Sequence, residues 1–158
     1  MGKALPNTQT RVMENTDERI NERLRREMEA RVYYFAQSPD QIDARLEELD
    51  REWDIERVLE THAAGVSLFG ILMARRHRKW LVLPFAVAGF LMQHAIQGWC
   101  PPVPLFRKLG IRTVHEINDE RRALKILRGD FDDINLSDLK DPQGRARKAL
   151  QALDGDGA

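Results

Sequence analysis

The chain alternates between polar stretches and two long stretches without charge. Charged residues crowd residues 11–60 and 107–148, whereas residues 61–74 and 80–106 contain no Asp, Glu, Lys or Arg. Within the polar stretches, apolar residues recur every three to four positions, which is the spacing of amphipathic helices. This pattern predicts an all-α protein in which two polar helical arms flank an apolar centre.

The first arm predicts two helices that meet at a proline. A stripe of apolar residues indicates the first helix: Ile20, Leu24, Met28 and Val32 or Phe35. Pro39 ends this helix and suits the first turn of the next one, and Ser38 and Gln41 have the spacing of a capping box. The second helix carries a stripe typical of helix–helix packing, at Ile42, Leu46, Leu49 and Trp53. We therefore expect an antiparallel, amphipathic helical hairpin over residues 15–57, after a flexible tail over residues 1–14.

The apolar centre predicts a short hydrophobic hairpin. Its two runs extend from Ala63 to Ala74 and from Trp80 to Trp99. A membrane-spanning helix needs about 20 apolar residues, whereas about 10–14 suit a core helix or an interfacial segment. The second run meets this length, and the first does so only if residues 58–62 lie among the lipid headgroups. We expect a membrane hairpin within residues 58–99. The alternative is a soluble helical oligomer that buries both runs in a shared core.

Basic and aromatic residues mark the edges of the two runs. The loop between them contains Arg75, Arg76, His77, Arg78 and Lys79, whose cations suit lipid phosphates. At a rise of about 1.5 Å per residue, a tryptophan at each end of the second run would sit near the two edges of a hydrocarbon layer of about 30 Å. We expect the membrane interface to include Arg75, Arg76, Arg78, Lys79, Trp80 and Trp99.

Small and amide residues form one stripe on each run. The first stripe is Ala63, Ser67, Gly70 and Ala74, and the second is Ala86, Gly89, Gln93 and Gln97. Small residues let helix backbones approach closely, and side-chain amides can hydrogen-bond between helices in lipid. We expect the two stripes to face each other within the hairpin, although such spacing also arises by chance in segments rich in Ala and Gly.

The second arm predicts amphipathic helices after a proline-rich break. Residues 101–104 contain three prolines and cannot continue the preceding helix. A capping-box spacing at Thr113 and Glu116 opens an amphipathic helix that continues to Gly129, with its apolar stripe at Ile117, Leu124 and Leu127. Asp141-Pro142 opens another helix. Residues 113–158 are therefore predicted as C-terminal helices and a tail.

A resemblance to a known family supports the hairpin. The step Gly98-Trp99-Cys100-Pro101, followed by Leu105, Leu109-Gly110-Ile111 and Arg112, resembles the end of the YgaP-like transmembrane domain family. In that family two short helices form a membrane hairpin, alone or fused to a rhodanese sulfurtransferase domain. The resemblance covers residues 58–112 and implies such a hairpin here. It implies no sulfurtransferase activity, because the single cysteine lies outside any α/β pattern.

Three residues are weak candidates for chemistry. A thiol at Cys100 could carry a persulfide or sense oxidation, although the helix C-terminus before it disfavours a thiolate. Its alternative role is that of a packed structural cysteine. An antiparallel hairpin would bring His62 and His94 to similar depth, but two histidines without a third ligand make an incomplete metal site. We expect no enzyme activity, no metal and no cofactor.

Charge and composition limit the classes of partner that the chain can bind. The chain contains 25 Lys and Arg and 25 Asp and Glu, so a general nucleic-acid binder is not expected. The polar first thirty residues predict no secretory signal peptide. We expect a bacterial inner-membrane scaffold or interaction protein. Its hairpin would bind membrane lipid, and its arms would bind a second copy or a protein partner. The alternative is a thiol or sulfur-relay accessory protein acting through Cys100.

The orientation carries a conflict. Long charged arms favour a cytoplasmic location for the arms, and the positive-inside rule favours the cytoplasm for the basic loop as well. A hairpin of two spanning helices places its arms and its loop on opposite sides of the membrane, so it cannot satisfy both preferences. A hairpin that inserts without crossing the bilayer would satisfy both.

Overall fold

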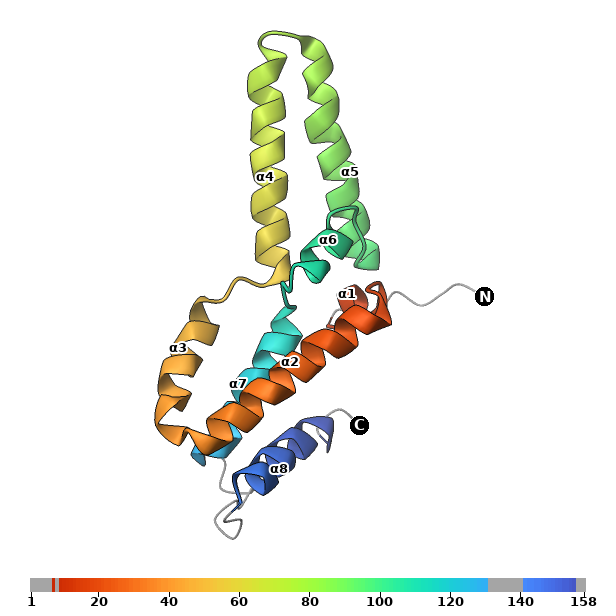
Figure 1. Cartoon of the computed structure of the whole chain (residues 1–158). Helices are drawn as coiled ribbons and strands as arrows, with labels where there is room; N and C mark the ends of the chain where they lie inside the picture. The colour runs from red at the N-terminus through yellow and green to blue at the C-terminus, as the bar shows by residue number, and fades with distance from the viewer. Residues whose placement is uncertain (1–6, 8, 131–140, 156–158) are drawn as a thin grey trace, which may run out of the picture. The chain divides into compact units, whose positions relative to one another are not determined.

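The computed structural model describes residue 7, residues 9–130 and residues 141–155 (Figure 1). All regular structure in these residues is helical, which confirms the all-α prediction. The chain divides into two compact units. Unit 1 comprises Met1–Asn21 and Trp53–Thr113, and unit 2 comprises Glu22–Glu52 and Val114–Ala158. The first arm thus contributes to both units, and most of it shares unit 2 with the C-terminal helices.

Unit 1 is built on an antiparallel pair of helices, α4 (Ile55–Ala74) and α5 (Val82–Gln97), as Figure 1 shows. A short 3-10 turn, η2 (Arg78–Leu81), leads into α5. The Asp54 carboxylate caps α4 by accepting the N–H of Arg57 at 2.7 Å. Gly98 ends α5 in the left-handed conformation, with φ of 74°.

Two short helices pack at the open end of this pair. They are α1 (Arg11–Glu14) and α6 (Val103–Lys108). An apolar cluster joins them to the hairpin through Val12, Ile55, Leu59, Cys100 and Val103. The flexible tail predicted over residues 1–14 therefore needs a correction at 11–14, because Val12 enters this cluster and is 3% exposed. Residues 1–6 and 8 of that tail lie outside the described residues.

Unit 2 gathers the remaining helices around one core. These are α2 (Glu18–Gln37), η1 (Pro39–Gln41), α3 (Ile42–Arg51), α7 (Val114–Arg128) and α8 (Pro142–Gly155). The predicted stripes supply much of this core, including Val32, Phe35, Ile42, Leu46, Leu49, Leu124 and Leu127. The apolar faces of α2 and α3 thus pack in a common core with α7 and α8, so the expected hairpin does not stand alone.

Two details of the first arm differ from expectation. Ser38 makes no side-chain cap, and the Gln41 side chain instead accepts the hydroxyl of Tyr34 at 3.2 Å, so the capping box does not form. Trp53 lies beyond the end of α3 and is 47% exposed. The Arg57 guanidinium covers its ring at 4.6 Å, a cation–π contact in place of helix packing.

A buried carboxylate ties three helices of unit 2 together. Glu120 on α7 is fully buried, and its two oxygens accept the Nε of Arg31 at 3.0 Å and the Nε of Arg45 at 2.9 Å. The arginines come from α2 and α3. Because both oxygens are paired with cations, the charge is compensated where it is removed from water.

Candidate functional site

The outer surface of the α4–α5 hairpin is apolar and exposed. Phe85 is 77% exposed and Val82 70%. Other large apolar side chains share this surface with exposures of 37% or more: Leu68, Phe69, Ile71, Leu72, Trp80, Leu81, Phe90, Met92 and Ile96. We call this surface the apolar wall. Large exposed apolar patches are uncommon on soluble monomers and often mark sites of contact with membrane or with protein.

One helical stretch among the described residues is long and apolar enough to cross a membrane, Arg78–Gln97. Its 20 residues would extend about 30 Å at 1.5 Å per residue, the thickness of a hydrocarbon layer. Only 6% of its most apolar 18-residue segment is buried inside the protein, whereas a core helix of a soluble protein would be mostly buried. Helix α4 is different, because its first six residues include Glu56, Arg57 and Glu60.

The closed end of the hairpin carries unpaired cations. Arg75, Arg76, Arg78 and Lys79 are all exposed, and none of them forms an ion pair within the part of the chain that the structure describes. Trp80 follows them and meets Phe69 edge to face, with ring centroids 5.7 Å apart. Trp99, the other predicted interface residue, follows the opposite end of α5 and is half-buried.

The predicted packing stripes behave differently from each other. On the first, Ala63 and Gly70 are buried, and a Cβ added at Gly70 would lie 2.8 Å from Cδ of Pro84 on α5. Ser67 and Ala74 are half-buried. Gly70 is therefore the position of this stripe at which α5 approaches the backbone of α4 closely.

The second stripe does not face α4, contrary to our expectation. Ala86, Gly89 and Gln97 are exposed and Gln93 is half-buried, and no atom lies within 4 Å of a Cβ added at Gly89. Leu83 and Pro84 face Gly70 instead. A spacing of small residues identifies a stripe, but it does not reveal which neighbour the stripe meets.

A polar cluster closes the open end of the hairpin. His94 on α5 is 3% exposed, and its Nε2 lies 2.8 Å from Oε2 of Glu56 on α4. Arg11 on α1 places Nη2 3.3 Å from Oε1 of Glu56 and donates from Nη1 to the carbonyl of Ala95 at 2.9 Å. The hydrogen bond to His94 holds the pKa of Glu56 below its usual value of 4.5. The charge of Arg11 acts in the same direction, and burial opposes both.

The N-terminal segment also seals the end of α5. The side-chain amide of Asn15 donates to the carbonyl of Gln97 at 2.7 Å, so it satisfies one of the free carbonyls at the helix end. Gly98 fits beneath α1 so tightly that an added Cβ would lie 2.6 Å from the backbone carbonyl of Arg11. Sequence reasoning missed Arg11, Asn15 and Glu56, because polar residues far apart in sequence leave no periodic signal.

The two candidate histidines do not meet. His94 pairs with Glu56, whereas His62 is exposed and sets its ring edge to face against Phe106 on α6, with centroids 5.6 Å apart. No group of three metal-binding side chains occurs among the residues described. Cys100 is 2% exposed, and burial raises the pKa of its thiol. A protonated, buried thiol is a weak nucleophile.

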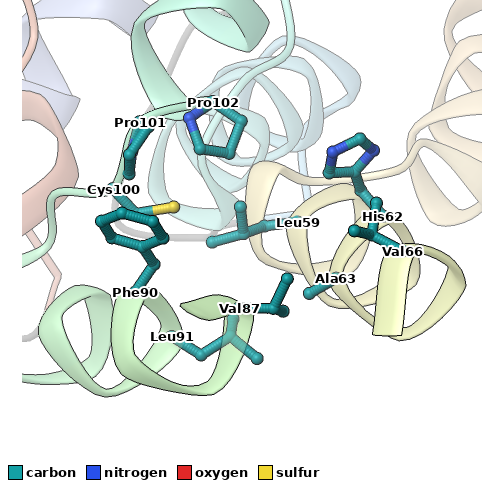
Figure 2. A pocket seen from close by; sticks show the side chains of 10 residues that line it. All are labelled: Leu59, His62, Ala63, Val66, Val87, Phe90, Leu91, Cys100, Pro101 and Pro102. Atoms are coloured by element: carbon teal, nitrogen blue, oxygen red, sulfur yellow. The ribbon is translucent and has the colours of Figure 1, made fainter. Parts of the chain in front are cut away.

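A cavity of about 350 Å³ lies between α4 and α5 beneath the turn that contains Cys100, Pro101 and Pro102 (Figure 2). Leu59 and Ala63 from α4 and Val87 and Leu91 from α5 also line it. The polar side-chain atoms in its wall are the sulfur of Cys100 and the imidazole of His62. No carboxylate, amine or guanidinium lines it, so the cavity suits an apolar ligand and lacks the groups for acid–base catalysis.

The chain is thus an all-helical protein with an exposed apolar hairpin, a basic tip and a polar base. Comparisons of the chain with protein-family models, with curated proteins and with solved structures found no match.

Proposed function

We propose that this chain is a small, membrane-anchored helical scaffold or interaction protein of the YgaP-like transmembrane type, with no catalysis of its own. The apolar wall carries this proposal. Burying a large apolar side chain completely contributes about 1.5–3 kcal/mol, so transferring this half-exposed set into lipid would contribute on the order of 10 kcal/mol. Such a term is large enough to hold a small protein at a bilayer.

The charges at the two ends of the hairpin fit this placement. The cations of the tip would lie among lipid phosphates, where each Lys or Arg contributes about 1 kcal/mol on an anionic surface. Charges at the other end begin at Glu60 on α4 and continue into the polar cluster. The apolar wall therefore lies between two polar ends. In a bacterium this arrangement fits the inner membrane.

Unit 2 would supply the contacts of the scaffold. Its apolar stripes are used in its own core, so the remaining surface of its described residues is largely polar and contains paired charges, with Tyr34 and Val114 as the large exposed apolar side chains. Salt bridges at helical spacing cover α2, such as Arg25 with Glu29 at 3.0 Å. We propose that this charged face binds a protein partner or a second copy.

Two other functions remain as alternatives. In a soluble helical oligomer, second copies would cover the apolar wall in place of lipid. In a sulfur relay, Cys100 would carry the sulfur. Its position on a cavity wall favours this role, whereas its protonated, buried thiol disfavours it.

The anchoring proposal can be tested with the full chain and vesicles. We expect the protein to float with phosphatidylcholine and phosphatidylglycerol vesicles and to resist a carbonate wash. Phe85→Asp places a charge on the wall, which costs up to about 2.5–3.5 kcal/mol in a bilayer, and should weaken flotation. Ala44→Asp, at an exposed position of α3, is the matched control and should float like the original. Complete release as a stable oligomer would favour the soluble alternative.

A further inference from the structure

The cavity between α4 and α5 is not needed for anchoring. A hairpin could expose the same apolar wall with its helices packed along their whole length. Here close approach occurs at Gly70, nearer the tip, whereas Ala63 and Leu59 line open space nearer the base. The volume of about 350 Å³ falls within the range of small-molecule sites, about 300–1,000 Å³.

The cavity lining is unsuited to water. The cavity is half open, and its side chains offer a water molecule only one imidazole and one thiol as polar partners. A hydrocarbon chain would make dispersion contacts with Leu59 and Leu91, which line the cavity. An apolar ligand would satisfy this lining.

The cavity is continuous with the apolar wall. Phe90 belongs to both, because it lines the cavity beside Cys100 (Figure 2) and is 42% exposed. His62 is exposed and also lines the cavity, so it lies at the mouth and offers one polar group there. A ligand that fits has a hydrocarbon part inside and a hydrogen-bond acceptor, such as an ester carbonyl, near the mouth.

From these features we propose that the cavity holds one acyl chain of a membrane phospholipid, with His62 beside the ester region of that lipid. The inference rests on the proposed membrane anchoring, which supplies the lipid at the cavity mouth. It adds that the hairpin binds one lipid chain between its helices, besides contacting the bilayer with its outer wall.

Photo-crosslinking in vesicles tests this directly. The probe is a phosphatidylcholine with a diazirine on its acyl chain, mixed into phosphatidylcholine and phosphatidylglycerol vesicles that carry the full chain. Adducts are located by mass spectrometry. We expect adducts on the cavity residues Leu59, Ala63 and Leu91. We also expect adducts on the outward-facing Phe85 and Met92, which report contact with the bilayer independently of the cavity.

Filling the cavity should remove one set of adducts and keep the other. Ala63→Leu and Val87→Phe each place extra volume in the lining and should lower the cavity adducts several-fold while the outer adducts persist. Ala64→Leu, at the exposed neighbouring position on α4, is the control and should change neither set. Two filling variants on different helices are used so that poor folding of one, judged by circular dichroism, leaves the other as the test.

The possible outcomes separate the two proposals. Outer adducts without cavity adducts would overturn the acyl-chain site and leave anchoring intact. Cavity adducts that survive both filling variants would overturn the site as well, because the chain would then lie elsewhere. The absence of all adducts would overturn the anchoring proposal and this inference with it.

Discussion

The imidazole of His94, near the end of α5, lies 2.8 Å from the carboxylate of Glu56, in the first turn of α4. This contact joins the two helices at their polar end, far from the turn that connects them in sequence. Arg11 adds a cation to the same carboxylate at 3.3 Å. The hairpin is therefore held at both ends, covalently at the tip and by charged hydrogen bonds at the base.

Removing the charge of Glu56 should loosen the base. Glu56→Gln weakens the hydrogen bonds to His94 and Arg11, and we expect a loss of about 1–2 kcal/mol in the free energy of unfolding, since bonds to charged groups contribute about 1.5–3 kcal/mol and this side chain is partly exposed. Urea unfolding of the full chain measures the loss. Glu60→Gln, at an exposed position on the same helix, is the control and should change the stability little. Equal stability of the two variants would contradict the role of the cluster.

The same contact should make stability depend on pH. The folded-state pKa of Glu56 lies below the usual value of 4.5, so the folded protein binds fewer protons than the unfolded chain as the pH falls through this range. Its contribution is therefore complete above the unfolded pKa and is lost as the pH falls through the folded pKa. We expect the stability difference between the original chain and Glu56→Gln to shrink from about pH 6 to about pH 3. A difference that stays constant over this range would contradict the pKa shift.

Gly98 should tolerate no side chain. Gly98→Ala adds a Cβ at a φ of 74° and 2.6 Å from the backbone of Arg11, so it combines conformational strain with a clash against α1. Gly110→Ala is the matched control, because its φ is 90° and nothing lies within 4 Å of the added Cβ. Strain alone costs about 1–3 kcal/mol, and we expect Gly98→Ala to lose clearly more than Gly110→Ala in equilibrium unfolding. Equal losses would mean that α1 moves aside at no cost.

The basic tip should make vesicle binding sensitive to lipid charge. Replacing Arg75, Arg76, Arg78 and Lys79 together with Gln should weaken binding to phosphatidylglycerol vesicles by up to about 4 kcal/mol, at about 1 kcal/mol for each cation near an anionic surface. Binding to purely zwitterionic vesicles should change little, which serves as the internal control. A vesicle partition assay at two salt concentrations measures both. A similar loss on both lipid compositions would indicate a damaged hairpin.

Cys100 should react slowly in the folded protein. Its thiol is buried and its pKa is raised by burial, so we expect slow labelling by a membrane-impermeant maleimide at neutral pH and fast labelling after unfolding. Mass spectrometry of the labelled chain follows the reaction. Fast labelling of the folded protein would revive the sulfur-relay alternative, because it would require an accessible thiolate.

Many of the buried helix faces and some of the helix boundaries follow from local patterns. Apolar spacing predicts the buried faces at Val32, Leu46 and Leu124 because a helix repeats every 3.6 residues and its core side must repeat with it. The break at Pro39 and the stop at Gly129, with φ of 93°, are fixed by the backbone chemistry of single residues.

Local patterns do not predict the polar cluster at the base of the hairpin, nor which side of α5 meets α4. The pairing of Arg11 with Glu56 joins positions 45 residues apart, and neither residue lies in a repeat that points to the other. The stripe that contains Gly89 has the same kind of spacing as the stripe that contains Gly70, yet only the latter meets the other helix of the hairpin. The rotation of α5 about its axis decides this, because it places Leu83 and Pro84, and not Gly89, against Gly70.

The bond from Arg11 to the carbonyl of Ala95 closes a loop of 84 positions, whereas α4 and α5 are connected by a short turn. Contacts that are close in sequence form early in folding, and those that close long loops form late because more chain entropy is lost first. The hairpin should therefore assemble before α1 docks on it. Residues 11–15 are synthesised before Gln97 and Gly98, yet they can take their native places only after those two residues have been made. The segment that contains α1 should thus complete unit 1 last.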